Sequence, residues 1–70
     1  MNHKKYVIYP NVKLGKNIDI GEYAIIGYYE KANKSHKTII GSNSIIRSHS
    51  IIYYNNNIGN NFVTGHGVLL

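Results

Sequence analysis

Aliphatic residues recur at every sixth position along this chain. One series reads Ile8, Leu14, Ile20 and Ile26, and a second reads Ile40, Ile46, Ile52, Ile58, Thr64 and Leu70, where Thr is the single exception. Six of the seven glycines come directly after members of these series. A helix repeats every 3.6 residues and would not align glycine at every sixth position. The pattern therefore predicts an all-β chain of short strands.

The other positions of each six-residue unit support the same interpretation. The third residue after each aliphatic is mostly Asn or Gly, the residues that tolerate the left-handed backbone of a tight turn. The set is Asn11, Asn17, Tyr23, Asn43, His49, Asn55, Asn61 and Gly67. The fourth residue is mostly small or apolar, as a second inward-facing position requires. We expect three units to form one triangular coil of about 18 residues, with coils stacked at the ~4.8 Å spacing of β-strands.

We expect a single domain over residues 1–70, with coil units at 8–28 and 40–70 that make about three coils. Ile26 and Ile40 are 14 positions apart, which is not a multiple of six, so residues 29–38 are predicted to leave the coil as a loop. This loop is polar and basic, and such excursions often carry function, although many are only tolerated. Because the chain stops at Leu70, on the first residue of a unit, we expect an N-terminal fragment that is incomplete at its C-terminus.

Composition narrows the class of protein. The chain has no cysteine, which excludes a disulfide framework and a thiolate metal site. Its net charge of +5 comes from scattered lysines and Arg47 without a recognition-helix pattern. We therefore expect a solvated surface, or attraction of an anionic ligand, and no nucleic-acid partner. No run approaches the ~20 apolar residues of a membrane span, so a cytoplasmic protein without a membrane partner is expected.

Residues 38–70 resemble the hexapeptide-repeat acyltransferases, above all the N-acetyltransferases that act on nucleotide sugars. The units Leu14-Gly-Lys-Asn-Ile-Asp and Ile20-Gly-Glu-Tyr-Ala-Ile match the family hexad of aliphatic, Gly, two variable residues, small or apolar, variable. The resemblance implies a left-handed parallel β-helix, a homotrimer, and active sites between neighbouring subunits. It also implies transfer of an acetyl group from acetyl-CoA to an amino or hydroxyl group of a sugar nucleotide or similar small-molecule acceptor, with His as general base.

Two of the four histidines are the candidates for this role. His66 lies in Thr64-Gly-His-Gly, where the flanking glycines leave backbone room for a ligand. His49 lies in the unit 18 positions earlier and is expected on the same face of the adjacent coil. An imidazole exchanges protons near neutral pH and can accept one from an attacking amine or hydroxyl. His36, in the basic loop, is a weaker candidate that would reach a neighbouring subunit.

Other interpretations stay open. Turn residues of such coils often point to solvent without a function, which would leave a non-catalytic, truncated or structural β-helix fragment. Gly65-His66 also resembles part of the zinc motif of γ-type carbonic anhydrases, although the second His of that motif would fall at residue 71, and we assign no metal ligand. Aromatic residues are expected to pack between coils or at a trimer interface, or to stack on a sugar or adenine ring. They are Tyr28, Tyr29, Tyr53 and Tyr54.

Overall fold

The structure, a computed structural model, describes residues 5–30 and 37–70. This part of the chain contains eight short strands and no helix. They are β1 (Val7–Ile8), β2 (Val12–Leu14), β3 (Asp19–Ile20), β4 (Ile25–Tyr28), β5 (Thr38–Ile40), β6 (Ile45–Ile46), β7 (Ile51–Tyr53) and β8 (Asn57–Ile58). All pairings are parallel, in three sheets of order β1-β4-β7, β2-β5-β8 and β3-β6. The predicted all-β class is confirmed, and no helix of the described residues could cross a membrane.

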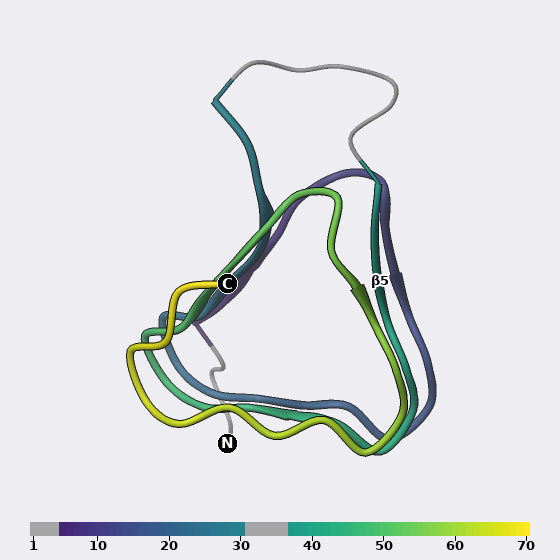
Figure 1. The fold of residues 1–70 in the computed structure, drawn as a ribbon. Coiled ribbons are helices and arrows are strands. Elements are labelled where there is room, and N and C mark those ends of the chain that lie inside the picture. Colours follow the sequence, from purple (N-terminus) through teal and green to yellow (C-terminus); the bar gives the residue numbers. More distant parts are fainter. Residues whose placement is uncertain (1–4, 31–36) are drawn as a thin grey trace.

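Paired strands are separated by either 18 or 26 residues. Ile8 pairs with Ile26, 18 positions further along the chain. Ile20 pairs with Ile46, 26 positions further, because the segment after β4 intervenes. Eighteen residues correspond to three six-residue units. The larger separation therefore contains an insertion of eight residues. Figure 1 shows the chain following a three-sided outline, with one sheet along each side.

We call one passage around these three sides a layer. The first layer contains β1, β2 and β3, and the second contains β4, β5 and β6. The third contains β7, β8 and the segment through Val63, which bridges to Ile45 of β6. Leu69 bridges to Ile51 of β7 and so lies above the third layer. Backbone hydrogen bonds join each layer to the next on all three sides.

The six-residue series supplies the core. The buried apolar side chains are Ile20, Ala24, Ile26, Ile40, Ile46 and Ile52. Ile8 and Leu70, the first and last members of the series, are 40% and 42% exposed because each has a layer on only one side. Burying an isoleucine side chain contributes about 1.5–3 kcal/mol, so the middle layer holds most of the hydrophobic stabilisation.

The fourth position of each unit is buried or half-buried, as predicted, and in two units it carries a buried hydroxyl, Ser44 or Ser50. The Ser44 hydroxyl is completely buried, donates to the Gly41 carbonyl at 2.8 Å and accepts from the Phe62 N–H of the next layer at 3.2 Å. One unit later, the Ser50 hydroxyl likewise accepts from the Val68 N–H of the next layer at 3.2 Å, but it donates to the Gly65 carbonyl of that next layer at 3.0 Å. Because each hydroxyl both donates and accepts, these polar groups are buried without an unsatisfied hydrogen-bonding atom.

All eight predicted turn residues have a left-handed backbone. Asn11, Asn17, Tyr23, Asn43, His49, Asn55 and Asn61 have φ between 58° and 64°, and Gly67 has φ of 65°. This conformation costs most L-residues roughly 1–2 kcal/mol, and Asn is among the few non-glycine residues that adopt it routinely. The Asn-rich turns therefore place the corners of the three-sided outline.

Replacing Asn61, which has φ of 61°, tests this account of the turns. Asn61→Ala is expected to lower the free energy of unfolding by about 1 kcal/mol, because the left-handed backbone is sterically less favourable for alanine than for asparagine. Asn61→Gly is the matched control and should retain nearly all the stability. Urea unfolding followed by circular dichroism measures both. An equal loss in the two variants would contradict a backbone origin.

The predicted loop 29–38 extends one residue too far. β5 begins at Thr38, whose side chain is 1% exposed and whose backbone pairs in register with Val12 of β2. Thr38 also lies close to the Tyr53 carbonyl, with its Oγ1 at 3.5 Å. A β-branched residue suits a strand, so Thr38 belongs to the layer rather than to the excursion. His36 lies outside the described residues.

Four tyrosines, Tyr9, Tyr28, Tyr29 and Tyr53, pack against one another from layer to layer. The Tyr28 ring meets Tyr9 of the first layer at a centroid distance of 5.6 Å and Tyr53 of the third at 5.5 Å, both edge to face. Tyr29 meets Tyr9 in the same way at 4.9 Å. Such pairs contribute about 0.5–1.5 kcal/mol each beyond their buried area. The aromatic column thus joins all three layers next to the point where the chain leaves β4.

Candidate functional site

The candidate histidines lie at the corner that follows β3 and β6. The His49 N–H donates to the Glu22 carbonyl at 3.0 Å, and the Gly67 N–H donates to the Ser48 carbonyl at 2.9 Å. The same hydrogen bond is thus repeated from one layer to the next. Equivalent residues of the three layers therefore form columns, one of Glu22, Ser48 and His66 and a second of Tyr23, His49 and Gly67. We call residues 21–24, 47–50 and 65–67 the His66 corner.

His66 and His49 share this corner but lie in neighbouring columns. The Nδ1 atom of His66 is 2.8 Å from the Ser48 hydroxyl. The His49 ring lies against Tyr23, with a centroid distance of 5.2 Å and an interplanar angle of 36°. The expectation that the two histidines occupy the same face of adjacent coils therefore holds only for the corner as a whole. The spacing of 18 residues places Ser48, not His49, directly below His66.

The backbone on both sides of His66 is open. A Cβ atom added to Gly67 would meet no atom within 4 Å, and one added to Gly65 would meet only the Val68 side chain, at 3.7 Å. The His66 side chain itself is exposed. The backbone beside the ring of His66 therefore borders open space, as it also does at Gly59.

Arg47 is held beside this corner by two hydrogen bonds to Thr64. Its N–H donates to the Thr64 hydroxyl at 2.9 Å, and its Nε donates to the Thr64 carbonyl at 3.1 Å. Thr64 is buried, so the arginine stem is fixed to a rigid part of the layer. Sequence reasoning missed Arg47 and Ser48 as site residues. Counting back 18 positions from His66 would have found Ser48.

Metal-ligating side chains do not cluster in the described residues. Within 5–30 and 37–70, no group of three or more His, Cys, Asp or Glu side chains is placed to hold an ion. A zinc site shared between subunits would draw its ligands from more than one chain, so the carbonic anhydrase alternative stays a prediction.

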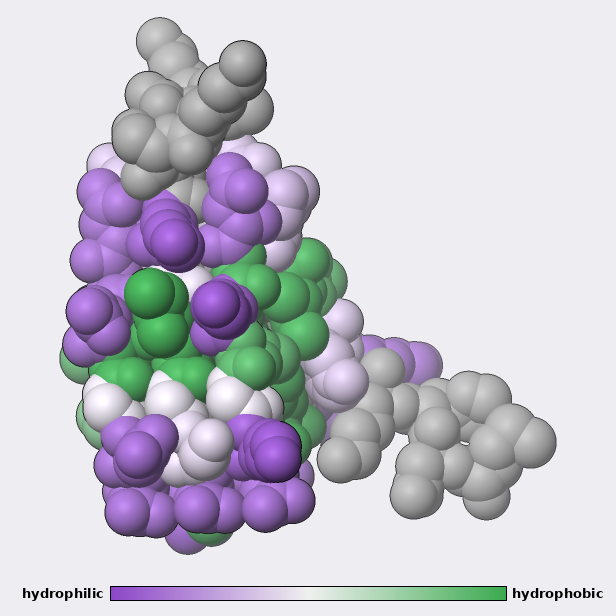
Figure 2. All heavy atoms as spheres, turned by 90° about the vertical axis from the view of Figure 1, so that its right-hand side faces the viewer, coloured by the Kyte–Doolittle hydropathy of each residue, from purple (hydrophilic) through white to green (hydrophobic). Residues whose placement is uncertain are grey.

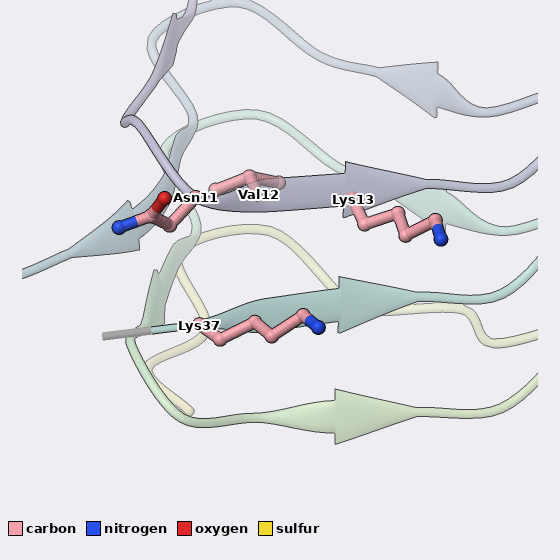
Figure 3. Close-up of a pocket in the computed structure, with 4 residues that line it drawn as sticks. All are labelled: Asn11, Val12, Lys13 and Lys37. Atoms are coloured by element: carbon pink, nitrogen blue, oxygen red, sulfur yellow. The ribbon is translucent and has the colours of Figure 1, made fainter. Parts of the chain in front are cut away.

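A basic depression lies on a different side of the molecule, over β2 and β5. It has a volume of about 320 Å³ and is lined by Asn11, Val12, Lys13 and Lys37. Figure 3 shows the Lys13 side chain on β2 and the Lys37 side chain just before β5 extended in the same direction, with Asn11 pointing away from them. Figure 2 shows that apolar atoms cross the middle of this side and that hydrophilic atoms gather at both of its ends. Two cations side by side favour the approach of an anionic group.

Comparison with family models gives no match to this chain. Comparison with curated proteins and with solved structures gives no significant match either. A function for the chain therefore has to be inferred from its residues and their arrangement.

Proposed function

We propose that this chain forms a left-handed parallel β-helix of the hexapeptide-repeat type and acts in acetyl transfer. The donor is acetyl-CoA, and the acceptor is an amino or hydroxyl group of a sugar nucleotide or similar metabolite. The observation that carries the proposal is the exposed, glycine-flanked His66 held by Ser48 at a corner of stacked six-residue units. The spacing of 18 residues between paired strands supports the fold part of the proposal.

His66 is the proposed general base. Its ring accepts the proton of the attacking amine or hydroxyl as the acceptor atom forms a bond to the thioester carbonyl carbon. The carbon–sulfur bond then breaks, and the proton passes from the imidazole to the departing thiolate. Backbone N–H groups would stabilise the transient oxyanion, as in other acyl transfers. No covalent intermediate on the protein is required.

An open corner needs a second wall to exclude water from the reaction. His66 is exposed, so the proposed site is completed by a neighbouring subunit of a homotrimer, in a cleft between two chains. Closing the site in this way strengthens each electrostatic interaction inside it. The trimer is therefore part of the proposal rather than an addition to it.

Positive charge suits both proposed substrates. Acetyl-CoA and sugar nucleotides carry several phosphate charges, and the chain has a net charge of +5. Arg47 lies at the His66 corner, and Lys13 with Lys37 lines the basic depression over β2 and β5. A field of this sign raises the local concentration of anionic substrates and so their rate of association.

Release of free thiol from acetyl-CoA, measured with a panel of amino sugars and sugar nucleotides, tests the proposal directly. His66→Asn is expected to lower the turnover rate by roughly 10²- to 10⁴-fold, the usual contribution of a general base. His49→Asn keeps a residue that tolerates the left-handed turn, and it should cause a smaller loss because His49 lies against Tyr23. Equal activity of wild type and His66→Asn would refute the role of His66.

Thermal unfolding with coenzyme A separates this function from a purely structural one. A ligand at 100 times its dissociation constant raises the free energy of unfolding by about 2.7 kcal/mol. We expect an upward shift of the melting temperature with coenzyme A. A melting temperature that stays constant up to millimolar coenzyme A would favour the non-catalytic β-helix over the acetyltransferase. Zinc analysis of the purified protein tests the carbonic anhydrase alternative.

A further inference from the structure

Arg47 breaks the six-residue repeat at the His66 corner. It has the place in its unit that Gly21 and Gly41 have in theirs. A Cβ atom on either of these glycines would lie 2.6 Å from a backbone nitrogen of the next layer. The nitrogen next to Gly41 belongs to Asn60, 19 positions later, and the same spacing from Arg47 leads to His66. The Cβ atom of Arg47 therefore has to be accommodated against the layer that carries His66.

The hydrogen bond between the layers also differs at this point. The Gly41 N–H donates to the Ile58 carbonyl of the next layer at 2.8 Å, and the equivalent bond of Gly21 is 2.7 Å long. At Arg47 the N–H donates to the Thr64 hydroxyl at 2.9 Å, and the side-chain Nε donates to the Thr64 carbonyl at 3.1 Å. Thr64 is the one member of the aliphatic series that has a hydroxyl. The two departures from the repeat thus meet in a single contact.

This contact orients the guanidinium group of Arg47. The group is planar and rigid, and it is held by Thr64, which is buried. A hydrogen bond to Nε leaves the two terminal nitrogens, Nη1 and Nη2, as a fork at the outer edge. Within residues 5–30 and 37–70, the structure gives these two nitrogens no hydrogen-bond partner. A guanidinium fork fits the oxygens of a carboxylate or phosphate with two parallel hydrogen bonds.

Packing does not explain why arginine and threonine are found here. Glycine in place of Arg47 would avoid the Cβ atom and retain the usual hydrogen bond, as at Gly41. Isoleucine in place of Thr64 would continue the buried aliphatic column of that side. Departures from a local rule without a structural gain are found mostly at functional sites. Arg47 is exposed and is the only arginine in the chain, so its fork can be reached by a ligand.

We infer that Arg47 is an anion-binding residue whose terminal nitrogens hold a carboxylate or phosphate group beside His66. Thr64 holds the guanidinium in place for this contact. As a binding site the inference stands without any reaction. As a part of catalysis it rests on the proposed acetyl transfer, and there it defines the class of acceptor: a molecule with an acidic group close to the amine or hydroxyl that is acetylated.

Titration of the full chain with inorganic phosphate or with acetate tests the binding site. Backbone amide resonances of Arg47 and residues 64–67 are followed at constant ionic strength, because salt screens exposed charges. We expect saturable shifts, and the anion that binds more tightly indicates whether the acidic group is a phosphate or a carboxylate. Arg47→Lys keeps the charge but loses the fork, and it should weaken binding by roughly 10-fold or more.

Lys13→Gln is the control for charge alone. It removes one positive charge on another side of the molecule and should leave the dissociation constant nearly unchanged. Shifts that do not saturate, or equal affinities of the wild type and Arg47→Lys, would overturn the inference.

The double variant Arg47→Gly/Thr64→Ile restores the repeat and separates binding from stability. It regains the usual hydrogen bond between layers and a buried aliphatic side chain, so its melting temperature should equal or exceed that of the wild type. Phosphate binding should be lost. A double variant that binds phosphate as the wild type does contradicts the role of Arg47. A melting temperature well below that of the wild type would show that the pair is kept for stability, against the inference.

Kinetics distinguish the failure of this inference from the failure of the proposed function. If the chain transfers acetyl groups, Arg47→Lys should raise KM roughly 10-fold for an acceptor with an acidic group and leave kcat nearly unchanged. The KM of a neutral acceptor should not change. If no transfer is detected but phosphate binding depends on Arg47, the proposed function fails while the binding site holds. Equal effects on acidic and neutral acceptors would overturn the assignment of the acceptor class.

Discussion

Ile46→Ala is expected to lower the free energy of unfolding by about 2–5 kcal/mol. The Ile46 side chain is fully buried in the middle layer and pairs in register with Ile20. Truncation removes buried methyl groups and leaves a cavity that the rigid layers on either side close only in part. Small domains are stable by about 5–15 kcal/mol, so the loss is a large part of the total. Urea unfolding followed by circular dichroism measures it.

Ile45→Ala is the matched control for this prediction. Ile45 is the neighbouring residue of β6 and has the same side chain, but it points to the opposite face of the strand and is only partly buried. Its truncation should cost clearly less than that of Ile46, because part of the Ile45 side chain already contacts water. Equal losses at the two positions would mean that the six-residue series does not line the interior.

Gly41→Ala is expected to destabilise the chain by about 1–3 kcal/mol, as overpacking does in a close-packed interior. A Cβ atom on Gly41 would lie 2.6 Å from the backbone nitrogen of Asn60 in the next layer. Backbone atoms held in a sheet cannot move aside without breaking the pairing of β5 with β8. Thermal unfolding should therefore show a melting temperature lower by about 4–8 °C for each kcal/mol lost.

Gly59→Ala tests whether this cost comes from the neighbouring layer. Gly59 has the same place in its unit as Gly41, one layer further on, and a Cβ atom there meets nothing within 4 Å. Alanine should be neutral or stabilising by up to about 1 kcal/mol, since it reduces the entropy of the unfolded chain. A similar melting temperature in both variants would show that glycine is not needed for close stacking.

The repeat itself could be predicted from the sequence because one geometric constraint acts on every unit. Each turn needs a left-handed residue, which selects Asn or Gly, and each strand needs an inward aliphatic side chain. Even Tyr23, which is a poor left-handed residue, adopts positive φ because the units before and after it fix the turn. The phase of the pattern therefore located the turns and the core together.

The candidate site was predicted less completely, because His49 and His66 differ by one position within their six-residue units. His49 and His66 fall in neighbouring positions of their units, and the pattern of aliphatic residues does not report on side chains at a corner. The sequence does not distinguish Ser48 from the other serines of the chain; only the structure shows its contact with His66. The buried hydroxyls of Ser44 and Ser50 were hidden for a similar reason, since their role depends on hydrogen bonds made to another layer.

The spacing between paired strands also governs how a nascent chain can assemble. β1 finds its partner β4 only after 18 more residues have been synthesised, and β2 must wait for 26. Each layer of such an array is stabilised by contact with its neighbours. The layers are therefore expected to assemble in the order in which they are synthesised. The eight-residue insertion delays the second β-sheet relative to the first, so Tyr9 and Tyr28 can pack together before the side that carries Lys13 and Lys37 can close.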